Sequence, residues 1–212
     1  MARCQFISRM PEIRRNLLHL WQEVSESDRE LGAAWYPRAH RIMVEWAETY
    51  GYSIATVACV TAAISPQLEW TRNLVIADDV LAGRLPSIGG VLRMNLRKAE
   101  RIRDDRAGQI TPYFPHGPKV ASFACNLGGD YSIVTVDTHA MQAALCDVQA
   151  NYRLRWQPYS VFAQCYADVA NALQIEPATF QAIIWHTWKR LYPRTRKLSE
   201  RRQWHIVGEL ED

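Results

Sequence analysis

Residues 54–64 read IATVACVTAAI, a run that is apolar on nearly every side. A helix of this composition is buried all round, because it has no polar face to turn toward water. Ser65 and Pro66 follow directly, and a proline disfavours helical backbone in the residue before it. We therefore predict a central buried helix over residues 54–64, with the other elements packed around it.

Apolar residues recur at helical spacing on both sides of this central run. We expect further helices at residues 13–24, 39–50, 74–81, 91–102, 118–127, 138–146, 160–173 and 177–191. Gly51 is placed to end the helix over residues 39–50, since glycine adopts left-handed backbone without strain. Only residues 133–136 look extended, and one short strand has no partner with which to build a sheet. The predicted fold class is all-α.

The composition sets broad limits on the class of protein. A chain of 212 residues with 48% hydrophobic content can bury a substantial core, so we expect a single domain over residues 1–212. The net charge of +3 does not by itself indicate a nucleic-acid partner. Residues 186–205 are more basic, with seven Lys or Arg against the single acid Glu200. That segment fits a phosphate backbone or a solvated surface equally well.

The five cysteines are widely spaced and form no CxxC pair. Such spacing favours neither a disulfide framework nor a zinc or iron-sulfur site, so we predict no metal and no cofactor. No stretch is apolar and long enough to act as an export signal or to span a membrane. We therefore expect a cytoplasmic protein with no membrane partner.

Two short segments carry the candidate chemistry: residues 116–121 read HGPKVA, and residues 134–139 read VTVDTH. Gly117 permits a tight turn or close approach to a backbone, and Pro118 suits the first position of a helix, where its missing N–H is not needed. Such a helix start presents unpaired amides that can bind a phosphate. Lys119 would lie in the first turn, where the helix dipole disfavours a cation and so favours the neutral, nucleophilic amine.

Asp137 is expected to begin the next helix, where the positive end of the helix dipole stabilises a carboxylate. It can therefore hold negative charge beside a cation that develops during a reaction. Each residue also has a simpler explanation: Asp137 as an ordinary helix cap, and Lys119 as a surface cation. Their joint context favours the functional interpretation.

That context resembles the helix-hairpin-helix family of DNA glycosylases, in which a turn of the form G-x-G-x-K-x-A precedes a V-D-T-H or V-D-V-H segment. The matching residues are Gly117, Lys119, Ala121, Val136, Asp137, Thr138 and His139. Lys119 and Asp137 lie 18 positions apart. Upstream, residues 63–67 resemble the family's L-S-A-Q segment, and residues 95–102 resemble its N-x-K-A-x-x-I helix. The resemblance covers roughly residues 50–150.

The chain departs from the family pattern in several places. Pro115 replaces the first glycine of the hairpin turn, and the segment between Ile102 and Gly117 is too short for a full first hairpin helix. The cysteine ligands of the iron-sulfur cluster that endonuclease III relatives carry are absent. We expect the packing of Trp185 and Trp188 to take over the structural role of that cluster.

The resemblance implies a two-lobed all-α fold with the active site between the lobes. Lobe one would cover about residues 53–150, and lobe two would combine the N-terminal helices with about residues 151–212. The implied enzyme is a DNA glycosylase that flips a modified or damaged base out of double-stranded DNA and excises it. Lys119 would attack the sugar C1′ and add lyase activity at apurinic or apyrimidinic sites, while Asp137 would stabilise the cationic sugar. We expect a monomer.

The same resemblance implies contacts with the DNA. Gln67 would fill the gap left by the flipped nucleotide. The other expected DNA-binding residues are His116, Gly117, Pro118, Val120 and His139, and the two histidines are given no acid–base role. Trp70 and Tyr113 are the candidates for stacking on a base in its pocket.

Two other functions fit the same residues. An enzyme on this scaffold could act on hypermodified pyrimidines in phage DNA, and a hairpin module could bind DNA without catalysis. The sequence does not specify which base is recognised, because pocket residues come from loops and small changes there redirect specificity.

Overall fold

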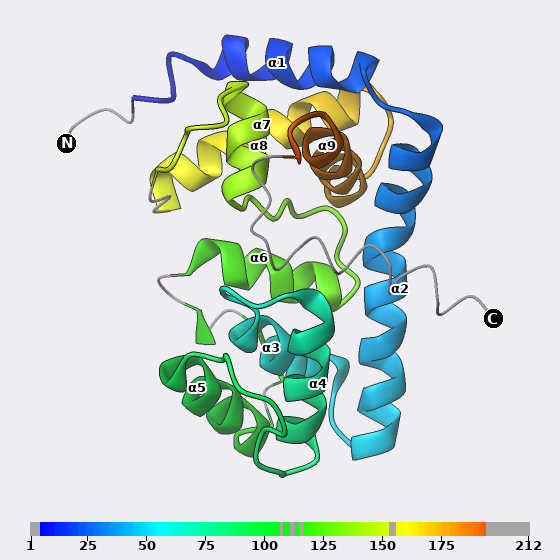
Figure 1. Ribbon diagram of the computed structural model, residues 1–212, viewed down its shortest axis with the longest axis vertical. Coiled ribbons are helices and arrows are strands. Elements are labelled where there is room, and N and C mark those ends of the chain that lie inside the picture. The colour runs from blue at the N-terminus through cyan, green and yellow to red at the C-terminus, as the bar shows by residue number, and fades with distance from the viewer. Residues whose placement is uncertain (1–4, 107, 111–112, 115–116, 153–155, 194–212) are drawn as a thin grey trace.

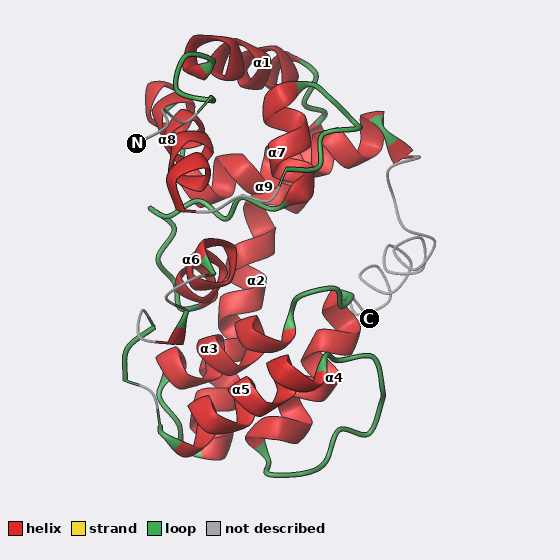
Figure 2. Cartoon of the chain, turned by 90° about the vertical axis from the view of Figure 1, so that its left-hand side faces the viewer, coloured by secondary structure: helices red, strands yellow, loops and turns green. Residues whose placement is uncertain are grey.

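The computed structural model describes residues 5–106, 108–110, 113–114, 117–152 and 156–193. Over these ranges the chain consists of helices and connecting loops and contains no strand (Figure 1, Figure 2). The helices are α1 (Met10–Gln22), α2 (Glu26–Tyr50), α3 (Ile54–Ile64), α4 (Trp70–Leu81), α5 (Arg93–Asp104), α6 (Pro118–Leu127), α7 (Thr138–Leu145), α8 (Trp156–Ala172) and α9 (Pro177–Leu191). The all-α prediction is confirmed. None of these described helices is long and apolar enough to cross a membrane.

Several helices begin or end at the residues where the sequence predicted it. α3 and α9 have the predicted bounds, and Pro118 is the first residue of α6. Gly51 ends α2 in the left-handed conformation, with φ 67°. Ser53 caps α3, because its hydroxyl accepts a hydrogen bond from Thr56 N at 3.1 Å. Local sequence signals therefore decide where these helices start and stop.

α2 begins well before the predicted residues 39–50. Ser25 and Asp28 form a reciprocal capping box at its start, with each side chain accepting from the other residue's backbone N–H at 3.1 Å. Pro37 lies inside the helix and is exposed. Its missing N–H leaves the carbonyl of exposed Ala33 open to water, so the helix tolerates the proline. The prediction was too short because the apolar spacing that indicated a helix was followed only from Ala39 onward.

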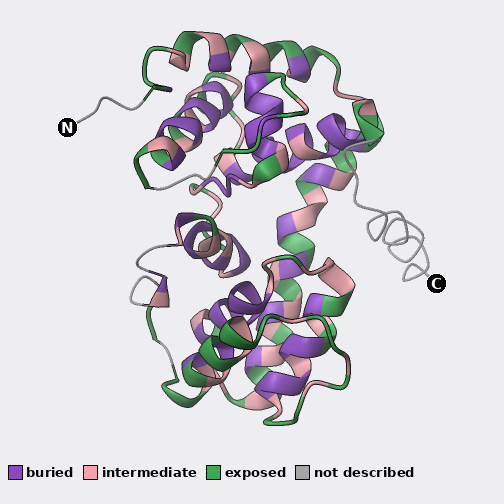
Figure 3. Cartoon of the chain, turned by 60° about the vertical axis from the view of Figure 1, so that its left-hand side comes forward, coloured by how far each residue is buried: buried purple, intermediate pink, exposed green. Residues whose placement is uncertain are grey.

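The buried apolar residues form two main clusters. The first lies among α1, α7, α8 and α9, and the second lies among α3, α4, α5, α6 and the second half of α2. α2 runs along both groups of helices (Figure 1). In both groups the buried residues face inward and the exposed ones lie outside (Figure 3). Every residue of α3 from Thr56 to Ile64 is buried, so the prediction of a central buried helix is confirmed.

These clusters do not follow the lobe boundaries expected from the sequence. The predicted lobe over residues 53–150 would place α7 with α3 to α6, but Met141 and Ala144 of α7 pack in the first cluster. Ala39 and Met43 of α2, which the prediction assigned to the other lobe, pack in the second. The chain therefore crosses from the second group to the first between α6 and α7, because the apolar face of α7 meets α1 and α9.

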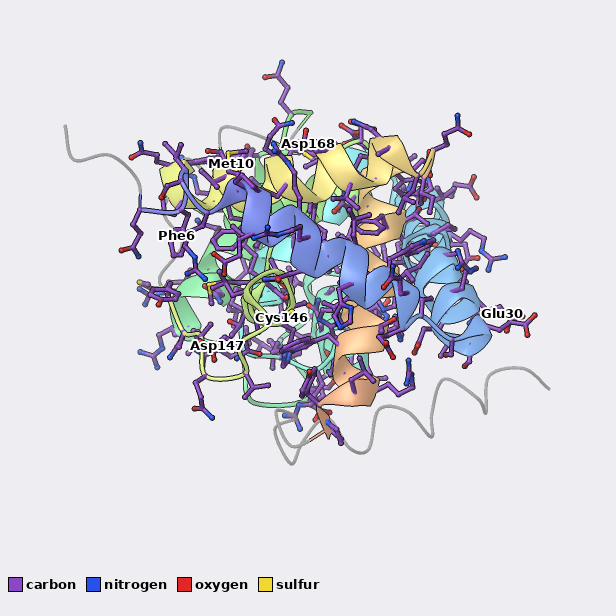
Figure 4. The ribbon with its side chains drawn as sticks, turned by 90° about the horizontal axis from the view of Figure 1, so that it is seen from above. Phe6, Met10, Glu30, Cys146, Asp147 and Asp168 are labelled. Atoms are coloured by element: carbon purple, nitrogen blue, oxygen red, sulfur yellow. The ribbon has the colours of Figure 1, made fainter. Side chains whose placement is uncertain are left out.

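α1 and α8 lie side by side over the first cluster, as the view from above shows (Figure 4). Arg14 of α1 forms an ion pair with Asp168 of α8. Phe6, just before α1, packs on Phe162 of α8 with a distance of 4.9 Å between the ring centroids. These contacts attach the N-terminal helix to α8 within the first group of helices.

α2 and α9 approach each other closely at Gly32. A Cβ atom built on Gly32 would lie 2.5 Å from Ile183 Cα and 2.6 Å from Ile183 N. No real Cβ makes such a contact with backbone, so this crossing requires glycine. Near the start of α2, the Asp28 carboxylate also accepts a hydrogen bond from Arg190 Nε of α9 at 2.8 Å. The first part of α2 is thus held against α9.

We predict that Gly32→Ala lowers the free energy of unfolding by about 3 kcal/mol, because the new methyl group forces the α2 and α9 backbones apart. Urea denaturation measures the change. Gly89→Ala is the matched control, since a Cβ at exposed Gly89 meets no atom within 4 Å, and a change within about 0.5 kcal/mol is expected there. Equal stability of the two variants would show that the close crossing does not exist in solution.

Candidate functional site

A cavity of ≈ 410 Å³ lies between the two groups of helices. Its wall comes from α4 and α6 of the second group, α7 and α9 of the first, and α2, which runs along both. The lining residues are Trp35, Tyr36, Ser65, Gln67, Leu68, Glu69, Trp70, Asn73, Lys119, Phe123, Thr135, Asp137, Thr138, His139, Gln142, Gln181, Ala182, Trp185, His186 and Lys189. A cavity of this size accepts a small organic ligand.

The structure brings five of the predicted site residues to this one cavity. Lys119 and Asp137, 18 positions apart in the sequence, both line it, together with Gln67, Trp70 and His139. Lys119 and Gln67 are exposed, whereas the other three are partly buried. Gln67 has φ 68°, a left-handed conformation that is strained for any residue with a Cβ. The cavity thus combines an exposed amine, a carboxylate and an aromatic ring.

Other predicted residues do not line the cavity. Tyr113 packs against the second cluster, and its hydroxyl donates a hydrogen bond to Asp105 Oδ2 at 3.3 Å. The expectation that Tyr113 contacts a base in the pocket is therefore not met, because the ring lies on the side of α5. Pro118 and Val120 are at the start of α6 and are not among the residues that line the cavity. His116 lies outside the described residues.

Gly117 precedes α6 with φ −122°, a conformation that other residues adopt readily. A Cβ built there would meet nothing nearer than Val120 Cβ at 3.9 Å, which is an ordinary contact. The backbone at Gly117 therefore does not itself require glycine, and the close approach of another backbone at this residue stays a prediction.

Asp137 caps α7 and is also held from α9. Its Oδ1 accepts a hydrogen bond from Ala140 N at 2.7 Å, and its Oδ2 accepts one from Trp185 Nε1 at 3.2 Å. The Lys189 ammonium lies 4.1 Å from the centroid of the Trp185 ring. Trp185 was expected to serve core packing, and the structure instead places it in the cavity wall as a donor to the carboxylate. Both carboxylate oxygens are therefore fixed in direction.

The extended segment before Asp137 is held by a buried tyrosine rather than by a second strand. Tyr159 Oη accepts a hydrogen bond from Val136 N at 3.0 Å and donates one to Val134 O at 2.9 Å. Burial raises the pKa of Tyr159 to about 12, so the hydroxyl keeps the proton that it donates. One short extended stretch is stable here because a side chain replaces the missing ladder of hydrogen bonds.

Asn126 of α6 fixes the same segment from the other side. Its Nδ2 donates hydrogen bonds to Asp130 O at 2.8 Å and to Ile133 O at 2.7 Å. Its Oδ1 accepts one from Thr135 Oγ1 at 2.6 Å, and Thr135 lines the cavity. Since Asn126 belongs to the helix that starts beside Lys119, this network ties the lysine's helix to the segment that carries Asp137.

Aromatic side chains form one wall of the cavity. The Trp35 ring centroid lies 5.3 Å from that of Trp70 and 5.9 Å from that of Phe123. Tyr36 lies beside them, and its hydroxyl donates a hydrogen bond to Gln181 Oε1 at 3.3 Å. Trp35 and Tyr36 were missed in the sequence because they lie in the first half of α2, which was not recognised as helical.

α9 contributes Gln181, Trp185 and Lys189 to the cavity wall. These residues are four positions apart and therefore share one face of the helix, next to the apolar stripe that packs in the first cluster. Lys189 is only 1% exposed, although it is charged. The spacing of four was visible in the sequence, and it is the signal that could have identified this second face.

The described residues hold no group of three or more His, Cys, Asp and Glu side chains that is arranged to bind a metal ion. Cys59, Cys125, Cys146 and Cys165 are all free thiols. Burial raises the pKa of the Cys59 thiol to about 12, so this side chain behaves as an apolar residue.

A protein-family model matches residues 4–191, a range that includes all nine helices of the described residues and the whole cavity wall. The chain belongs to the family of unknown function DUF7178. No curated protein and no solved structure matches the chain. For this DUF7178 member the function has to be argued from the cavity itself.

We predict that Tyr159→Phe lowers the free energy of unfolding by about 2 kcal/mol, because it leaves the backbone of Val134 and Val136 buried without partners. Tyr152→Phe is the control, since the Tyr152 ring packs on Phe6 and is partly exposed, and a change within about 0.5 kcal/mol is expected. Chemical denaturation of both variants gives the comparison. A Tyr159→Phe variant as stable as the control would mean that the hydroxyl does not hold the extended segment.

Proposed function

We propose that the chain is a DNA glycosylase that also has lyase activity at apurinic or apyrimidinic sites. The observation that carries this proposal is that Lys119 and Asp137 line the same cavity, although they come from separate segments. A nucleophilic amine and a carboxylate in one cavity are what lysine-dependent removal of a base requires. The basic start of α6, with Lys119 in its first turn, supports contact with DNA.

The arrangement of helices supports the same proposal. A helix-hairpin-helix glycosylase needs two lobes with the active site between them. In this chain two groups of helices flank the cavity, and both contribute to its wall. We propose that α3 to α6 with the second half of α2 form one lobe and that α1, α7, α8 and α9 form the other. This division replaces the one drawn from the sequence.

An extruded base would enter the cavity along the aromatic wall. Extrusion costs roughly a few kcal/mol, which stacking on aromatic rings and filling of the gap in the DNA must offset. Trp70 and Trp35 offer the rings, and exposed Gln67 lies at the same cavity with its side chain available to occupy the gap. An amide is suited to this place because it can bond to the base that is left without a partner.

The reaction follows from the two central groups. The Lys119 amine would bond to C1′ while the bond from C1′ to the base breaks, and the electron pair leaves with the base, which takes up a proton from the amine. Opening of the C1′–O4′ bond then gives an imine, as a proton passes from the nitrogen to O4′. Loss of a C2′ proton and of the 3′ phosphate would cut the strand. Asp137 would stabilise the positive charge on the sugar during the first step.

We predict that the wild-type chain forms a covalent adduct with a duplex that contains an abasic site when borohydride is present, because the hydride reduces the imine at Lys119. Lys119→Ala should lose the adduct completely. Lys98→Ala is the control, since exposed Lys98 lies on α5 away from the cavity, and its adduct yield should equal that of the wild type.

The same assay separates this proposal from a DNA-binding module. Binding of the duplex with no adduct, and with no base released from duplexes containing 5-hydroxymethyluracil or oxidised purines, would contradict the enzymatic proposal. An adduct that persists in Lys119→Ala would show that another amine of the chain is the nucleophile. Duplexes of phage-modified DNA in the same panel distinguish a repair enzyme from one that acts on hypermodified pyrimidines.

We predict that Trp185→Phe lowers the rate of base release about tenfold or more, because the Asp137 carboxylate loses one of its two hydrogen-bond donors. Trp185 acts here as a positioning residue. The expected signature is a fall in the single-turnover rate with affinity for an abasic duplex and thermal stability unchanged. Trp46→Phe, which alters a ring outside the cavity, should leave the rate at the wild-type value. A Trp185→Phe variant at the wild-type rate would argue against this role.

A further inference from the structure

Asn73 of α4 is a buried amide in the cavity wall whose oxygen has no hydrogen-bond partner. The residue is 1% exposed, and its Oδ1 is enclosed by protein. Buried polar atoms are nearly always bonded, since an unbonded one has lost its water without compensation. Because Asn73 belongs to the cavity wall, a ligand in the cavity would supply the donor that this oxygen lacks.

The contrast with Asn126 shows that the side-chain oxygen of Asn73 does not hold the fold together. Asn126 is equally buried, but its amide makes three hydrogen bonds within the chain, two to carbonyl oxygens and one to Thr135. Asn73 makes no such bond through Oδ1. A leucine or methionine would fill the same volume without leaving a buried oxygen unbonded. The amide of Asn73 is therefore explained by a ligand and not by packing.

The position of Asn73 on α4 indicates the shape of this ligand. Trp70 lies three positions earlier, so the two side chains are neighbours on the same face of the helix. Trp70 belongs to the aromatic wall, on which a flat ring can stack. A flat ring that lies against this wall brings its edge to the amide of Asn73.

A second amide across the cavity offers the same chemistry. Gln142 Nε2 donates hydrogen bonds to Val148 O at 3.0 Å and Ala150 O at 3.2 Å, which fixes the direction of its amide. Its Oε1 is then left buried without a partner, and Gln142 lines the cavity from α7. The cavity wall therefore contains two amide oxygens and one carboxylate, all of which accept hydrogen bonds.

We propose that Asn73 is the specificity-determining residue of the cavity, and that it selects a base whose edge presents an N–H donor beside a carbonyl or ring-nitrogen acceptor. The base stacks on the wall that contains Trp70, its N–H donates to Asn73 Oδ1, and its acceptor receives Nδ2–H. This inference rests on the proposed glycosylase function, since it identifies the ligand as the flipped base. It excludes bases that are alkylated at that N–H.

The first experiment compares two activities of one variant. An abasic duplex contains no base, so Asn73→Leu should form the borohydride adduct within twofold of the wild type. On the base-containing duplex that the wild type processes, the same variant should release base at least about tenfold more slowly, because the N–H and the leucine cannot bond. Val75→Ala, on the exposed face of α4, should match the wild type in both assays. Base release by Asn73→Leu at the wild-type rate would overturn the inference and leave the glycosylase proposal intact.

A nearly isosteric variant covers the case in which Asn73→Leu loses both activities. Asn73→Asp keeps the shape but replaces the N–H donor with an oxygen that repels the acceptor of the base. We expect slow base release with a normal adduct yield on the abasic duplex. The wild type should also reject a duplex whose base carries a methyl group on that N–H, such as the N3-methyl form of 5-hydroxymethyluracil or the N1-methyl form of 8-oxoguanine. Equal release of the methylated and parent bases would overturn the inference.

Fluorescence titration tests the inference even if the chain has no activity on DNA. Trp35, Trp70 and Trp185 line the cavity, so a ring that enters it should change tryptophan emission. The probes are free uracil and adenine against 3-methyluracil and N6,N6-dimethyladenine. A parent base that binds at least about tenfold more tightly than its methylated form, with the difference lost in Asn73→Leu, supports the selection of an N–H edge. Equal binding of both forms, or no binding at all, would overturn it.

Discussion

The contact between α2 and α9 at Gly32 is the constraint on which the rest of the structure depends. Because a backbone atom of Ile183 occupies the space where a side chain of residue 32 would lie, the distance between these helices is set by main-chain atoms. Trp35 follows Gly32 by one turn, and Trp185 follows Ile183 by two positions. The crossing therefore decides where the aromatic wall stands and whether the indole N–H can reach Asp137. A larger distance between α2 and α9 would widen the cavity, and it would also break the hydrogen bond from Trp185 to Asp137.

A second set of contacts relates the lysine to the carboxylate. Lys119 lies at the start of α6 and Asp137 lies after the loop that follows it, so the loop has to return to the cavity. Asn126 near the end of α6 bonds to Ile133 and Thr135, and Tyr159 bonds to the backbone on either side of Thr135. Side chains from two helices thus replace the sheet that an extended segment normally needs. The position of Asp137 is a result of this network as much as of its own capping role.

Much of the fold was accessible from the sequence, because helix ends and apolar periodicity are local properties. The range 54–64 and the stops at Gly51 and Pro118 needed no knowledge of packing. The site was predicted only where a motif carried it, as for Lys119 and Asp137. Asn73 could not be identified, since nothing local distinguishes an asparagine with bonded oxygens from one that faces a cavity. The first half of α2 was missed because its buried residues include Asp28 and Gly32, which form no apolar stripe in the sequence.

The left-handed backbone of Gln67 has a consequence for the stability of the protein. A residue with a Cβ at φ 68° is destabilised by about 1 kcal/mol, and glycine would remove that strain at once. Evolution toward the most durable fold would therefore put glycine there. Glutamine instead places an amide in the wall of the cavity, at that cost in stability. A thermostabilised version of this protein, obtained by screening for heat resistance alone, should drift away from glutamine at this site and lose performance as it does so.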